Sequence, residues 1–560
     1  MSERLESKGH GQLNLDWSAA LVAGLVAAGL REVVLSPGSR STPLTLACLR
    51  HPDLHCEVIL DERSAAWFAL GRAKATGIPV ALVCTSGTAV ANWLPAVVEA
   101  NQSAVPLLLL SADRPPELQG WGANQTIDQS RIFDGQLRAS HAPGAPFAGF
   151  SADWLHQLAA RVIAESRWPL PGPVHINLAF REPLLPSSPE ITWATPASID
   201  TSAPTLVPDA SAVAALAAKL SGRRGVIVCA GSTSHDAGFA DAIGALAAAL
   251  QCPILAEPLS NLRFGPHDRS AICCHHERWL RDAATREQLT PEWVLRFGAF
   301  PVTRTLQDYL GSCGETYLVE AHGRWPDPLH HTRQLLRADS VAACTALLQA
   351  GLQPADSHWL AAFRAAEAEA QQQQALAPLP PEAALFSQLC AALPVDTTFF
   401  CGNSMPIRDL ATWSGSGAQT IRFHANRGAS GIDGNIATAS GLAASGPTVA
   451  VIGDLTAQHD IGSLVLMRQH PLVLVVINNG GGGIFDFLPA ASLPEFEAGW
   501  LTPQQCDFSA AAAAFGIAYR QTEDPAAAAA ASLAALSEGK ALVTELKVDR
   551  ELSRQRRRTG

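Results

Sequence analysis

Short apolar runs alternate with longer mixed stretches along the chain, and most of these runs end in polar residues or glycines. The clearest case covers residues 448–488, where the apolar runs 448–452 and 472–477 are separated by a stretch with helical spacing that ends at Pro471. Continuous apolar runs of this length are typical of buried parallel strands, and the stretch between them predicts a helical crossover. We therefore expect a parallel βαβ unit in this part of the chain.

The same alternation of strand, polar turn and helix fills three blocks of the sequence. The predicted strands are residues 32–35, 57–60, 80–84 and 106–110 in the first block, 225–229 and 295–300 in the second, and 397–401 in the third. A core helix is predicted over residues 17–30, and linkers over the Pro-, Ser- and Thr-rich residues 183–208 and the low-complexity residues 367–382. The sequence thus predicts an α/β protein with three doubly wound parallel-sheet domains, at residues 1–190, 205–365 and 380–560.

The composition is that of a large globular protein. Of the 560 residues, 48% are hydrophobic and 16% are charged, which is enough apolar material for several cores. The net charge of −11 argues against nucleic acid or an anionic membrane surface as a partner. The apolar residues 19–30 include glycines and are too few to span a bilayer, and the acidic N-terminus does not suit a signal peptide. We expect a cytoplasmic protein without membrane insertion.

Two other features are read as structural. The twelve cysteines lack the spacing of a disulfide framework, which predicts reduced thiols. The neighbours Cys273, Cys274, His275 and His276 cannot easily converge on one tetrahedral metal ion, so we expect them to be structural. The basic C-terminal residues 553–560 are few, and we expect a solvated tail there.

The ends of the two strands in the predicted βαβ unit carry candidate metal ligands. Asp454 follows the first strand and Asn479 follows the second, and the carboxyl ends of neighbouring parallel strands face the same crevice. A carboxylate, an amide oxygen and a glycine carbonyl suit Mg²⁺, while the glycines at 480–483 let the backbone approach a diphosphate. The alternative is a plain βαβ unit with turn-forming Asp and Asn, but the joint pattern favours a metal–diphosphate site.

Two turns of the first block are further candidates, each with an ordinary alternative. Residues 36–43 lie between a predicted strand and a helix, which is a common anion-binding layout, and the guanidinium of Arg40 could grip a carboxylate. An exposed arginine in an ordinary turn explains this motif equally well. Glu62 lies at the carboxyl end of a strand, where a site would be, although a lone glutamate at a helix start more often stabilises the helix.

Several motifs together resemble one family of enzymes. These motifs are SPGSRSTPL, DERSAAWFALGRAKATG, SADRPPEL with GANQT, GNSMPIRDL, NRGASGIDG and GDLTA followed by NNGGGGIF. They are similar to the 2-succinyl-5-enolpyruvyl-6-hydroxy-3-cyclohexene-1-carboxylate (SEPHCHC) synthases, thiamine diphosphate enzymes of menaquinone and phylloquinone biosynthesis. Leu455 replaces the glycine of the general thiamine diphosphate signature, and it fits the GDL pattern of this family. The resemblance covers both outer blocks and, more weakly, the middle one.

The resemblance implies the thiamine diphosphate enzyme fold, with a pyrimidine-binding, a central and a diphosphate-binding domain in chain order. It also implies an activity: 2-oxoglutarate loses CO₂ and its succinyl semialdehyde unit is added to isochorismate in a Stetter-like 1,4-addition. The cofactors would be thiamine diphosphate and Mg²⁺, with Mn²⁺ as the alternative metal. In this family the active sites lie at a subunit interface, so we expect a homodimer or a homotetramer.

The resemblance also assigns roles to residues around the cofactor. Asp454, Asn479 and the carbonyl of Gly481 would hold the metal ion, and Ile432 would support the bent cofactor. Glu62 would hydrogen-bond the pyrimidine ring and relay a proton, which requires a carboxyl group whose pKa is raised by partial burial. The remaining cofactor contacts would be Ser430, Gly431, Leu455, Thr456, Gly482, Ile484 and Phe485.

Both implied substrates carry two carboxylates, and arginines gathered around one crevice would suit them. Arginines in turns after strands, or in matched motif loops, are Arg40, Arg114, Arg304, Arg408 and Arg427. Neutral hydrogen bonds would come from Ser39, Asn124, Gln125 and Ser404. The family often has a Lys-Arg pair in the middle domain where this chain has Thr303-Arg304, which removes one possible carboxylate contact.

Two alternatives stay open at this point. One is another thiamine diphosphate-dependent 2-oxo acid decarboxylase or carboligase, such as acetolactate synthase, which Leu455 disfavours. The other is a non-catalytic protein that keeps the fold. The presence of Glu62, Asp454 and Asn479 argues against it.

Overall fold

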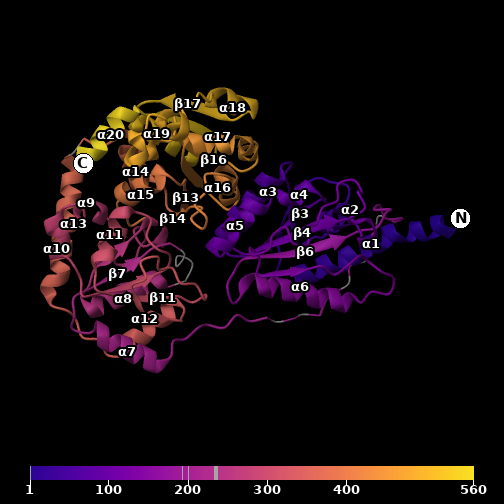
Figure 1. The fold of residues 1–560 in the computed structure, drawn as a ribbon, viewed down its shortest axis with the longest axis horizontal. Helices are drawn as coiled ribbons and strands as arrows, with labels where there is room; N and C mark the ends of the chain where they lie inside the picture. Colours follow the sequence, from indigo (N-terminus) through magenta and orange to yellow (C-terminus); the bar gives the residue numbers. More distant parts are fainter. Residues whose placement is uncertain are drawn as a thin grey trace. The chain divides into compact units, whose positions relative to one another are not determined.

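Three six-stranded parallel sheets, each accompanied by helices, make up the protein (Figure 1). This computed structural model describes residues 2–188, 190, 191, 193, 195–197, 199, 201–231, 238–376 and 378–559, with side chains from residue 9 to residue 557. In the part described, no helix is long and apolar enough to cross a membrane. All twelve cysteines are free. The predicted class, α/β with three doubly wound parallel sheets, is confirmed.

The first sheet has the strand order β2-β1-β3-β4-β6-β5. Its strands are β1 (Glu32–Leu35), β2 (His55–Val58), β3 (Val80–Cys84), β4 (Leu107–Asp113), β5 (Ala139–His141) and β6 (Pro173–Ala179). Its helices are α1 (Ser2–Ala27), α2 (Thr42–Arg50), α3 (Glu62–Thr76), α4 (Thr88–Ala91), α5 (Leu94–Ser103), α6 (Ala152–Arg167) and the 3₁₀ turn η1 (Pro116–Leu118). Alternate residues of the strands enter two separate cores: Val33, Leu35 and Val83 pack with α1 and α6, whereas Val34, Leu82 and Cys84 pack with α3 and α5. The sheet is therefore covered on both faces.

The second sheet has the order β12-β11-β10-β7-β8-β9. Its strands are β7 (Gly225–Cys229), β8 (Ile254–Ala256), β9 (Ile272–Cys273), β10 (Trp293–Phe297), β11 (Glu315–Val319) and β12 (Thr332–Leu336). Its helices are α7 (Ala210–Leu220), α8 (Phe239–Leu250), η2 (Pro258–Ser260), α9 (His276–Trp279), α10 (Ala283–Gln288), α11 (Arg304–Ser312), α12 (Ser340–Gln349) and α13 (Ser357–Leu376). Counted within this sheet, the order reads 3-2-1-4-5-6, which is that of a Rossmann fold.

The third sheet, ordered β14-β13-β15-β16-β18-β17, repeats the order of the first when its strands are counted from one. Its strands are β13 (Thr397–Cys401), β14 (Ile421–His424), β15 (Thr448–Gly453), β16 (Leu472–Asn478), β17 (Ala518–Thr522) and β18 (Leu542–Lys547). Its helices are α14 (Pro381–Ala392), α15 (Met405–Trp413), α16 (Asn435–Ala443), α17 (Asp454–His459), α18 (Phe508–Ala514), α19 (Pro525–Ser537) and α20 (Arg550–Thr559). Short turns are η3 (Ile461–Arg468), η4 (Gly483–Phe487), η5 (Pro489–Ser492) and the π-helix η6 (Glu497–Leu501).

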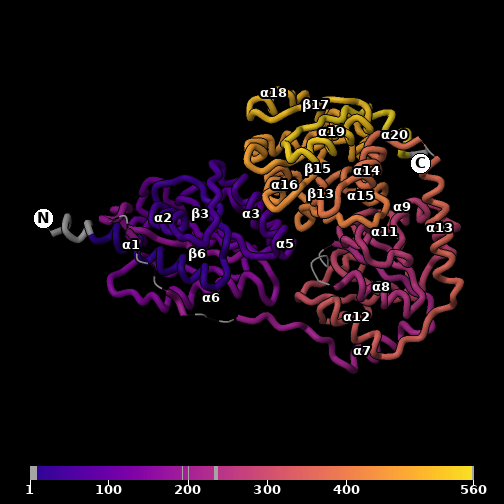
Figure 2. Tube along the Cα trace, turned by 180° about the vertical axis from the view of Figure 1, so that it is seen from behind, coloured from indigo at the N-terminus to yellow at the C-terminus, as the bar shows by residue number. Residues whose placement is uncertain are grey.

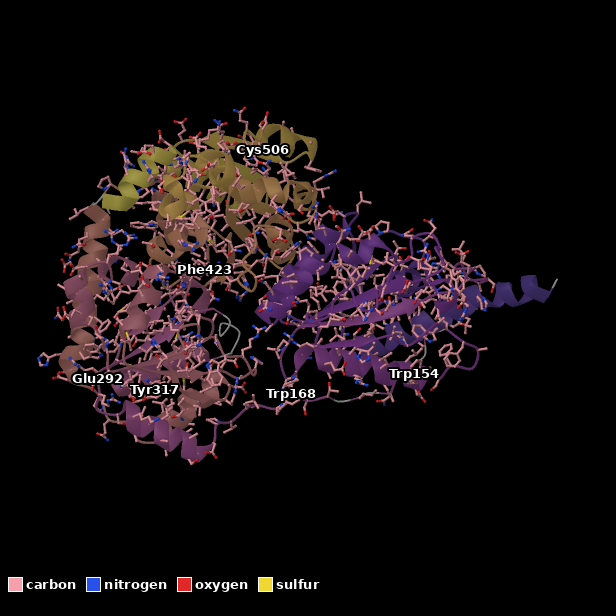
Figure 3. The ribbon with its side chains drawn as sticks, viewed as in Figure 1. Trp154, Trp168, Glu292, Tyr317, Phe423 and Cys506 are labelled. Atoms are coloured by element: carbon pink, nitrogen blue, oxygen red, sulfur yellow. The ribbon has the colours of Figure 1, made fainter. Side chains whose placement is uncertain are left out.

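The chain forms two compact units. Unit 1 comprises Met1–Ala203, Asn426–Ser445 and Gly462–Leu466, and unit 2 comprises Pro204–Ala425, Gly446–Ile461 and Met467–Gly560. Unit 2 contains both the second and the third sheet, which share an aromatic contact: the ring of Phe423, labelled in Figure 3, lies 5.5 Å from those of Phe264 and Phe399. The predicted boundaries of the three domains stay predictions.

In unit 1, helix α16 packs directly on α3, although the sequence between them is long (Figure 2). Small residues make the approach possible. A Cβ atom placed on Gly71 of α3 would lie 2.1 Å from the carbonyl oxygen of Thr438, and one placed on Gly441 of α16 would lie 2.2 Å from that of Phe68. The two helices therefore touch backbone to backbone at this crossing.

Some local predictions differ from the structure. The crossover after residue 453 is a short α-helix followed by a 3₁₀ turn, and not one helix. Strand β2 begins two residues before the predicted start at Glu57. The low-complexity stretch that begins at Glu367 was predicted to be a linker, but up to residue 376 it continues α13. Its Ala, Glu and Gln residues are strong helix formers. Residue 377 lies outside the described residues, as do residues 189, 192, 194, 198 and 200 of the other predicted linker.

The basic C-terminus also differs from the prediction. Instead of a solvated tail it forms helix α20, and Arg557, near its end, is mostly buried against two carboxylates. The pairing partners, Glu382 and Asp409, are far away in the sequence, which is why a local charge pattern could not reveal them.

Candidate active site

The ends of β15 and β16 meet at one edge of the third sheet, because these strands are parallel neighbours with Gly453 opposite Ile477. Asp454 follows β15 and is 6% exposed. Its Oδ1 accepts a hydrogen bond of 2.8 Å from the backbone N–H of Leu455, and its Oδ2 accepts one of 2.8 Å from that of Gly481. Burial raises the pKa of Asp454 to about 6, although these hydrogen bonds oppose the shift.

The two asparagines after β16 have different surroundings. The Nδ2 group of Asn478 donates to Glu545 over 2.7 Å, and its Oδ1 accepts from the N–H of Gly480 over 3.0 Å. The Oδ1 atom of Asn479 is buried and has no hydrogen-bond partner in the described part of the chain. A buried acceptor without a donor costs free energy, so its presence next to a carboxylate favours a site for a cation.

The glycine loop between these residues and η4 is tightly packed. A Cβ atom on Gly481, whose φ is +145°, would lie 2.4 Å from the carbonyl oxygen of Leu501, and one on Gly483 would lie 2.5 Å from Nδ2 of Asn479. The N–H of Gly482 donates to the Leu501 carbonyl over 2.7 Å. The Gly481 carbonyl accepts from the N–H of Gly483 over 2.9 Å, which leaves it a second lone pair.

This donor set fits the implied metal ion. A carboxylate, an orphaned amide oxygen and a backbone carbonyl are the hard oxygen ligands that Mg²⁺ and Mn²⁺ take. The other predicted cofactor contacts belong to the adjoining segments: Leu455 and Thr456 begin α17, while Ile484 and Phe485 lie in η4, and Thr456 alone among them is buried.

Glu62 is the first residue of α3 and is half-buried. The capping function at this helix start belongs to the preceding residue, because Oδ1 of Asp61 accepts the N–H of Arg63 over 2.9 Å. Burial and then the charge of Glu62 raise the pKa of the Cys84 thiol at the end of β3 well above its usual range, which is consistent with Glu62 lying near the end of that strand. The carboxylate of Glu62 is thus available for a role other than capping.

Residues 428–434 form a loop of unit 1 that is anchored at both ends. At its start, the fully buried carboxylate of Glu99 accepts the N–H groups of Gly428 over 2.9 Å and of Ala429 over 2.7 Å. At its end, a Cβ atom on Gly434 would lie 2.0 Å from the ring of Trp67 on α3. Three predicted cofactor contacts lie between these anchors: exposed Ser430 and half-buried Gly431 and Ile432.

The buried charge of Glu99 has a buried partner. Nζ of Lys74 lies 3.4 Å from Oε1 of Glu99 and donates to Oδ1 of Asn426 over 2.9 Å. Burial lowers the pKa of Lys74, and Glu99 opposes the shift. Asn426 precedes the half-buried Arg427, so this ion pair fixes the whole motif that carries Arg427 and Ile432.

The carboxyl edge of the first sheet brings two predicted arginines together. Buried Arg40 donates to the carbonyl of Phe180 over 2.9 Å and to Oε1 of Glu182 over 2.7 Å, and its Nε has no partner in the described chain. Arg114 donates to the hydroxyl of Ser86. Burial, and then the charge of Arg40, lower the pKa of Arg114, which places both cations in one neighbourhood.

The neutral residues of this edge lie around the same strand ends. Gln125 donates from Nε2 to the carbonyl of Ser86 over 2.8 Å, whereas Ser39 and Asn124 are exposed. The loops after β1 and β3 touch, since a Cβ atom on Gly38 would lie 2.3 Å from Cβ of Thr85. This edge therefore presents two guanidinium groups and several amide and hydroxyl groups close together.

In unit 2, Ser404 and Arg408 belong to one helix start. Ser404, with φ of 70°, precedes α15, and half-buried Arg408 donates to its carbonyl oxygen over 2.6 Å. Arg304 differs from the other predicted arginines: its side chain is 83% exposed and pairs with Asp308 over 2.7 Å. The hydroxyl of Thr303 donates to buried Glu277, so this residue has an internal role in the second sheet's domain.

Comparisons with known proteins agree with this geometry. Models of the thiamine pyrophosphate enzymes match residues 15–132 (N-terminal TPP binding domain) and 413–545 (C-terminal TPP binding domain). The 2-succinyl-5-enolpyruvyl-6-hydroxy-3-cyclohexene-1-carboxylate synthase of Dechloromonas aromatica (strain RCB) is 50% identical over 514 residues, which cover 91% of this chain and 94% of the relative. The chain belongs to the SEPHCHC synthase family.

Other relatives and a solved structure extend this result. Synthases of the same name from Chloroflexus aurantiacus and Myxococcus xanthus are 41% and 40% identical, over 91% and 96% of this chain and 89% and 95% of their own lengths. The crystal structure of benzoylformate decarboxylase from Polynucleobacter necessarius superposes with a TM-score of 0.72 at 18% identity, covering 96% of this chain and 99% of the other. The latter likeness concerns the fold alone.

Sequence reasoning missed several residues of this SEPHCHC synthase family member. Ser86 contacts the predicted Arg114 directly, whereas Lys74 and Glu99 contact chain neighbours of predicted residues, Asn426 next to Arg427 and Ala429 next to Ser430. None of the three was a candidate from the sequence. Ser86 follows β3 in a strand–turn–helix pattern, which was a usable signal. Lys74 and Glu99 lie inside helices, where a single charged residue usually faces solvent, so only the three-dimensional structure reveals their pairing.

Proposed function

We propose that this protein is a thiamine diphosphate- and Mg²⁺-dependent SEPHCHC synthase that decarboxylates 2-oxoglutarate and adds the succinyl semialdehyde unit to isochorismate, releasing CO₂, in menaquinone or phylloquinone biosynthesis. The observation that carries the metal and cofactor part is the buried, partnerless Oδ1 of Asn479 beside the carboxylate of Asp454 and the glycine loop. The family membership supports the reaction.

Each part of the described site has a task in this proposal. Asp454, Asn479 and the Gly481 carbonyl would hold Mg²⁺, or Mn²⁺ in its place, and Gly480, around which a Cβ atom meets nothing within 4 Å, would leave space for the diphosphate. Bound thiamine diphosphate supplies a nucleophilic carbon and an electron sink for the loss of CO₂. Glu62 would hydrogen-bond the pyrimidine ring and serve as the proton relay, while Ile432 would support the cofactor from the loop anchored at Glu99 and Trp67.

The arginines take the carboxylates of the substrates. Arg40 and Arg114 lie in one neighbourhood and can bind a carboxylate bidentately, with Gln125 and Ser39 as neutral donors. The other proposed substrate contacts are Asn124, Ser404, Arg408 and Arg427, of which Arg408 donates to the Ser404 carbonyl. Arg304 also belongs to the proposed set, and its exposed side chain, paired with Asp308, would have to exchange that partner for a substrate carboxylate.

A direct assay tests the reaction. We expect rapid release of CO₂ from 2-oxoglutarate in the presence of isochorismate, strictly dependent on added thiamine diphosphate and Mg²⁺ and abolished by a metal chelator. Glu62→Gln should slow turnover by about 10²- to 10⁴-fold, which is the usual contribution of a positioned acid–base group. Turnover of pyruvate without any turnover of 2-oxoglutarate would overturn the proposal and favour an acetolactate synthase.

We further propose a homodimer or homotetramer whose active sites combine Glu62 of one subunit with Asp454 of another. Mixing two inactive variants, Glu62→Gln and Asp454→Asn, then gives hybrid dimers with one intact site each. Random exchange of subunits should restore about a quarter of the wild-type activity, because half of the dimers are hybrids and half of their sites are intact. If no activity returns although subunit exchange is demonstrated by mass, each site is built within one chain.

A further inference from the structure

The C-terminal helix α20 (Figure 1) makes two bidentate ion pairs, one near each of its ends. Its arginines Arg550 and Arg557 are seven residues apart, which corresponds to about 10 Å along a helix axis. The carboxylates that they bind are Asp486 and Asp409, and both of these are nearly inaccessible to solvent. All of these residues belong to unit 2.

The first ion pair reaches the cofactor side of the candidate site. Nε of Arg550 donates to Oδ2 of Asp486 over 2.8 Å, and its second nitrogen donates to Oδ1 over 3.2 Å. Asp486 belongs to η4, directly after Ile484 and Phe485 and three residues after the end of the glycine loop. Since this segment has little regular structure of its own, a bidentate pair to a helix fixes both its position and its orientation.

The second ion pair reaches the substrate side. Both terminal nitrogens of Arg557 donate to the two carboxylate oxygens of Asp409, one of them over 2.9 Å, and Arg557 also lies 3.3 Å from Oε1 of Glu382. The hydroxyl of Ser553 donates to the same Glu382 oxygen over 2.7 Å. Asp409 is the neighbour of Arg408 on α15, the helix that starts after Ser404.

Without α20, these buried carboxylates would lose their cationic partners. An unpaired charge in a protein interior is strongly unfavourable, so Asp486 and Asp409 would either take up a proton or reach water through movement of η4 and α15, and in both cases the bidentate contacts that hold these segments are lost. The two segments carry predicted cofactor and substrate contacts, and they are connected to the same short helix. The helix therefore sets the spacing between the segments as well as their individual positions.

We propose that Arg550 and Arg557 are positioning residues of the active site, through which α20 holds η4 on the cofactor side and α15 on the substrate side. This inference rests on the proposed function for its substrate part. It assigns different effects to the two arginines: Arg550 governs the affinity for thiamine diphosphate, and Arg557 governs the KM of a dicarboxylate substrate.

The test compares Arg550→Gln, Arg557→Gln and the control Arg554→Gln in the full-length protein. The control removes an arginine that donates its hydrogen bond to Glu551 on α20 itself and acts on Asp486 only through its charge, without a hydrogen bond to it. Titration calorimetry with thiamine diphosphate at saturating Mg²⁺ gives the Kd of the cofactor, and steady-state assays give KM and kcat. Displacement of a contact by about 1 Å can cost 10²-fold, so we expect Arg550→Gln to raise the cofactor Kd by about tenfold or more.

For Arg557→Gln we expect about a tenfold higher KM for 2-oxoglutarate or isochorismate, with the cofactor Kd within about twofold of the wild type. Arg554→Gln should change neither quantity. A general loss of stability would lower the unfolding temperature and change Kd and KM together in both variants, and that outcome overturns the proposal. Unchanged Kd and KM in both variants overturn it as well.

Two further measurements keep the test decisive. If a glutamine variant does not fold, Arg550→Lys and Arg557→Lys keep the charge but lose the bidentate fork, and they should show the same division of effects at smaller size. If the wild type binds thiamine diphosphate but does not turn over 2-oxoglutarate, the proposed function fails. In that case the Kd of Arg550→Gln still decides whether α20 positions the cofactor side.

Discussion

The contact between α3 and α16 allows a quantitative prediction for the substitution Gly71→Ala. The new Cβ atom would lie 2.1 Å from the carbonyl oxygen of Thr438 and 3.0 Å from Cα of Gly441. Ordinary contacts between such atoms begin near 3.4 Å, and both partners are backbone atoms that no side-chain rotation can move. The helices must therefore separate by about 1 Å, and overpacking of this kind costs about 1–3 kcal/mol.

This separation acts directly on the candidate site. Helix α3 begins with Glu62, and α16 follows the loop that carries Ser430 and Ile432. A shift of about 1 Å between a catalytic group and its target can cost 10²-fold in rate, so we expect kcat/KM to fall about 10- to 100-fold. The cofactor Kd should rise by about tenfold, which corresponds to about 1.4 kcal/mol and lies within the overpacking cost.

Steady-state kinetics and titration calorimetry with thiamine diphosphate measure both effects. The matched control is Gly311→Ala on α11, another helical glycine, around which a Cβ atom meets nothing within 4 Å. That variant should keep its activity and gain up to about 1 kcal/mol of stability, because alanine is the better helix former. If Gly71→Ala keeps the kcat/KM and the cofactor Kd of the wild type, the argument from the helix contact is wrong.

Three further predictions concern buried polar groups. Asn479→Ala should weaken Mg²⁺-dependent cofactor binding by about tenfold or more. The unfolding temperature of the cofactor-free protein should stay the same, because Oδ1 of Asn479 has no hydrogen-bond partner to lose there. Unchanged cofactor binding together with a lower unfolding temperature would contradict a metal-binding role. Glu99→Gln removes the charge that pairs with Lys74, which should lower the free energy of unfolding by about 3–5 kcal/mol. It should also speed amide hydrogen exchange in residues 428–434, where the carboxylate accepts the N–H groups of Gly428 and Ala429. Unchanged exchange would show that other contacts hold this loop. Burial lowers the pKa of His175 to about 4 in the folded protein, so between pH 6.5 and 4 the unfolded chain binds the extra proton. The corresponding stability, about 3 kcal/mol, is complete above pH 6.5 and is lost as the pH falls to 4, and in His175→Gln this part of the pH dependence of the unfolding temperature should vanish.

The strands were the most predictable part of the fold. The limits of β1, β3, β7 and β13 agree with the prediction residue for residue, because each of these strands is a short, mostly apolar or β-branched run with a glycine or serine within the two residues that follow it. The edge strand β2 was misplaced, since its sequence, HCEV, has no continuous apolar run. The part of α13 after Glu367 was not predicted, because its low-complexity sequence suggested a linker although Ala, Glu and Gln are strong helix formers.

The candidate site also has a part that the sequence predicts and a part that it does not. Asp454 and Asn479 follow neighbouring strands, and the rule that ligands bind at the carboxyl ends of parallel strands was enough to make them candidates. Glu62 also follows a strand, but its role was assigned by the family resemblance. The supporting contacts could not be found in this way, because they join residues far apart in the chain: Glu99 with Gly428, Arg550 with Asp486, and Arg557 with Asp409. Arg304 stays a predicted substrate contact, and its pairing with Asp308 on the surface of α11 was likewise not predicted.

Unit 1 is built from separate stretches of the chain, which has a practical consequence when the protein is produced as fragments. A cut in the proline-rich stretch near Ala203 would separate α3 from α16, because residues Asn426–Ser445 belong to the first unit although they lie within the sequence of the third sheet. The N-terminal fragment would then expose the groove around Gly71, and the C-terminal fragment would carry an apolar helix without its support. The two pieces are accordingly expected to aggregate when produced separately and to become soluble when produced together, as in fragment complementation.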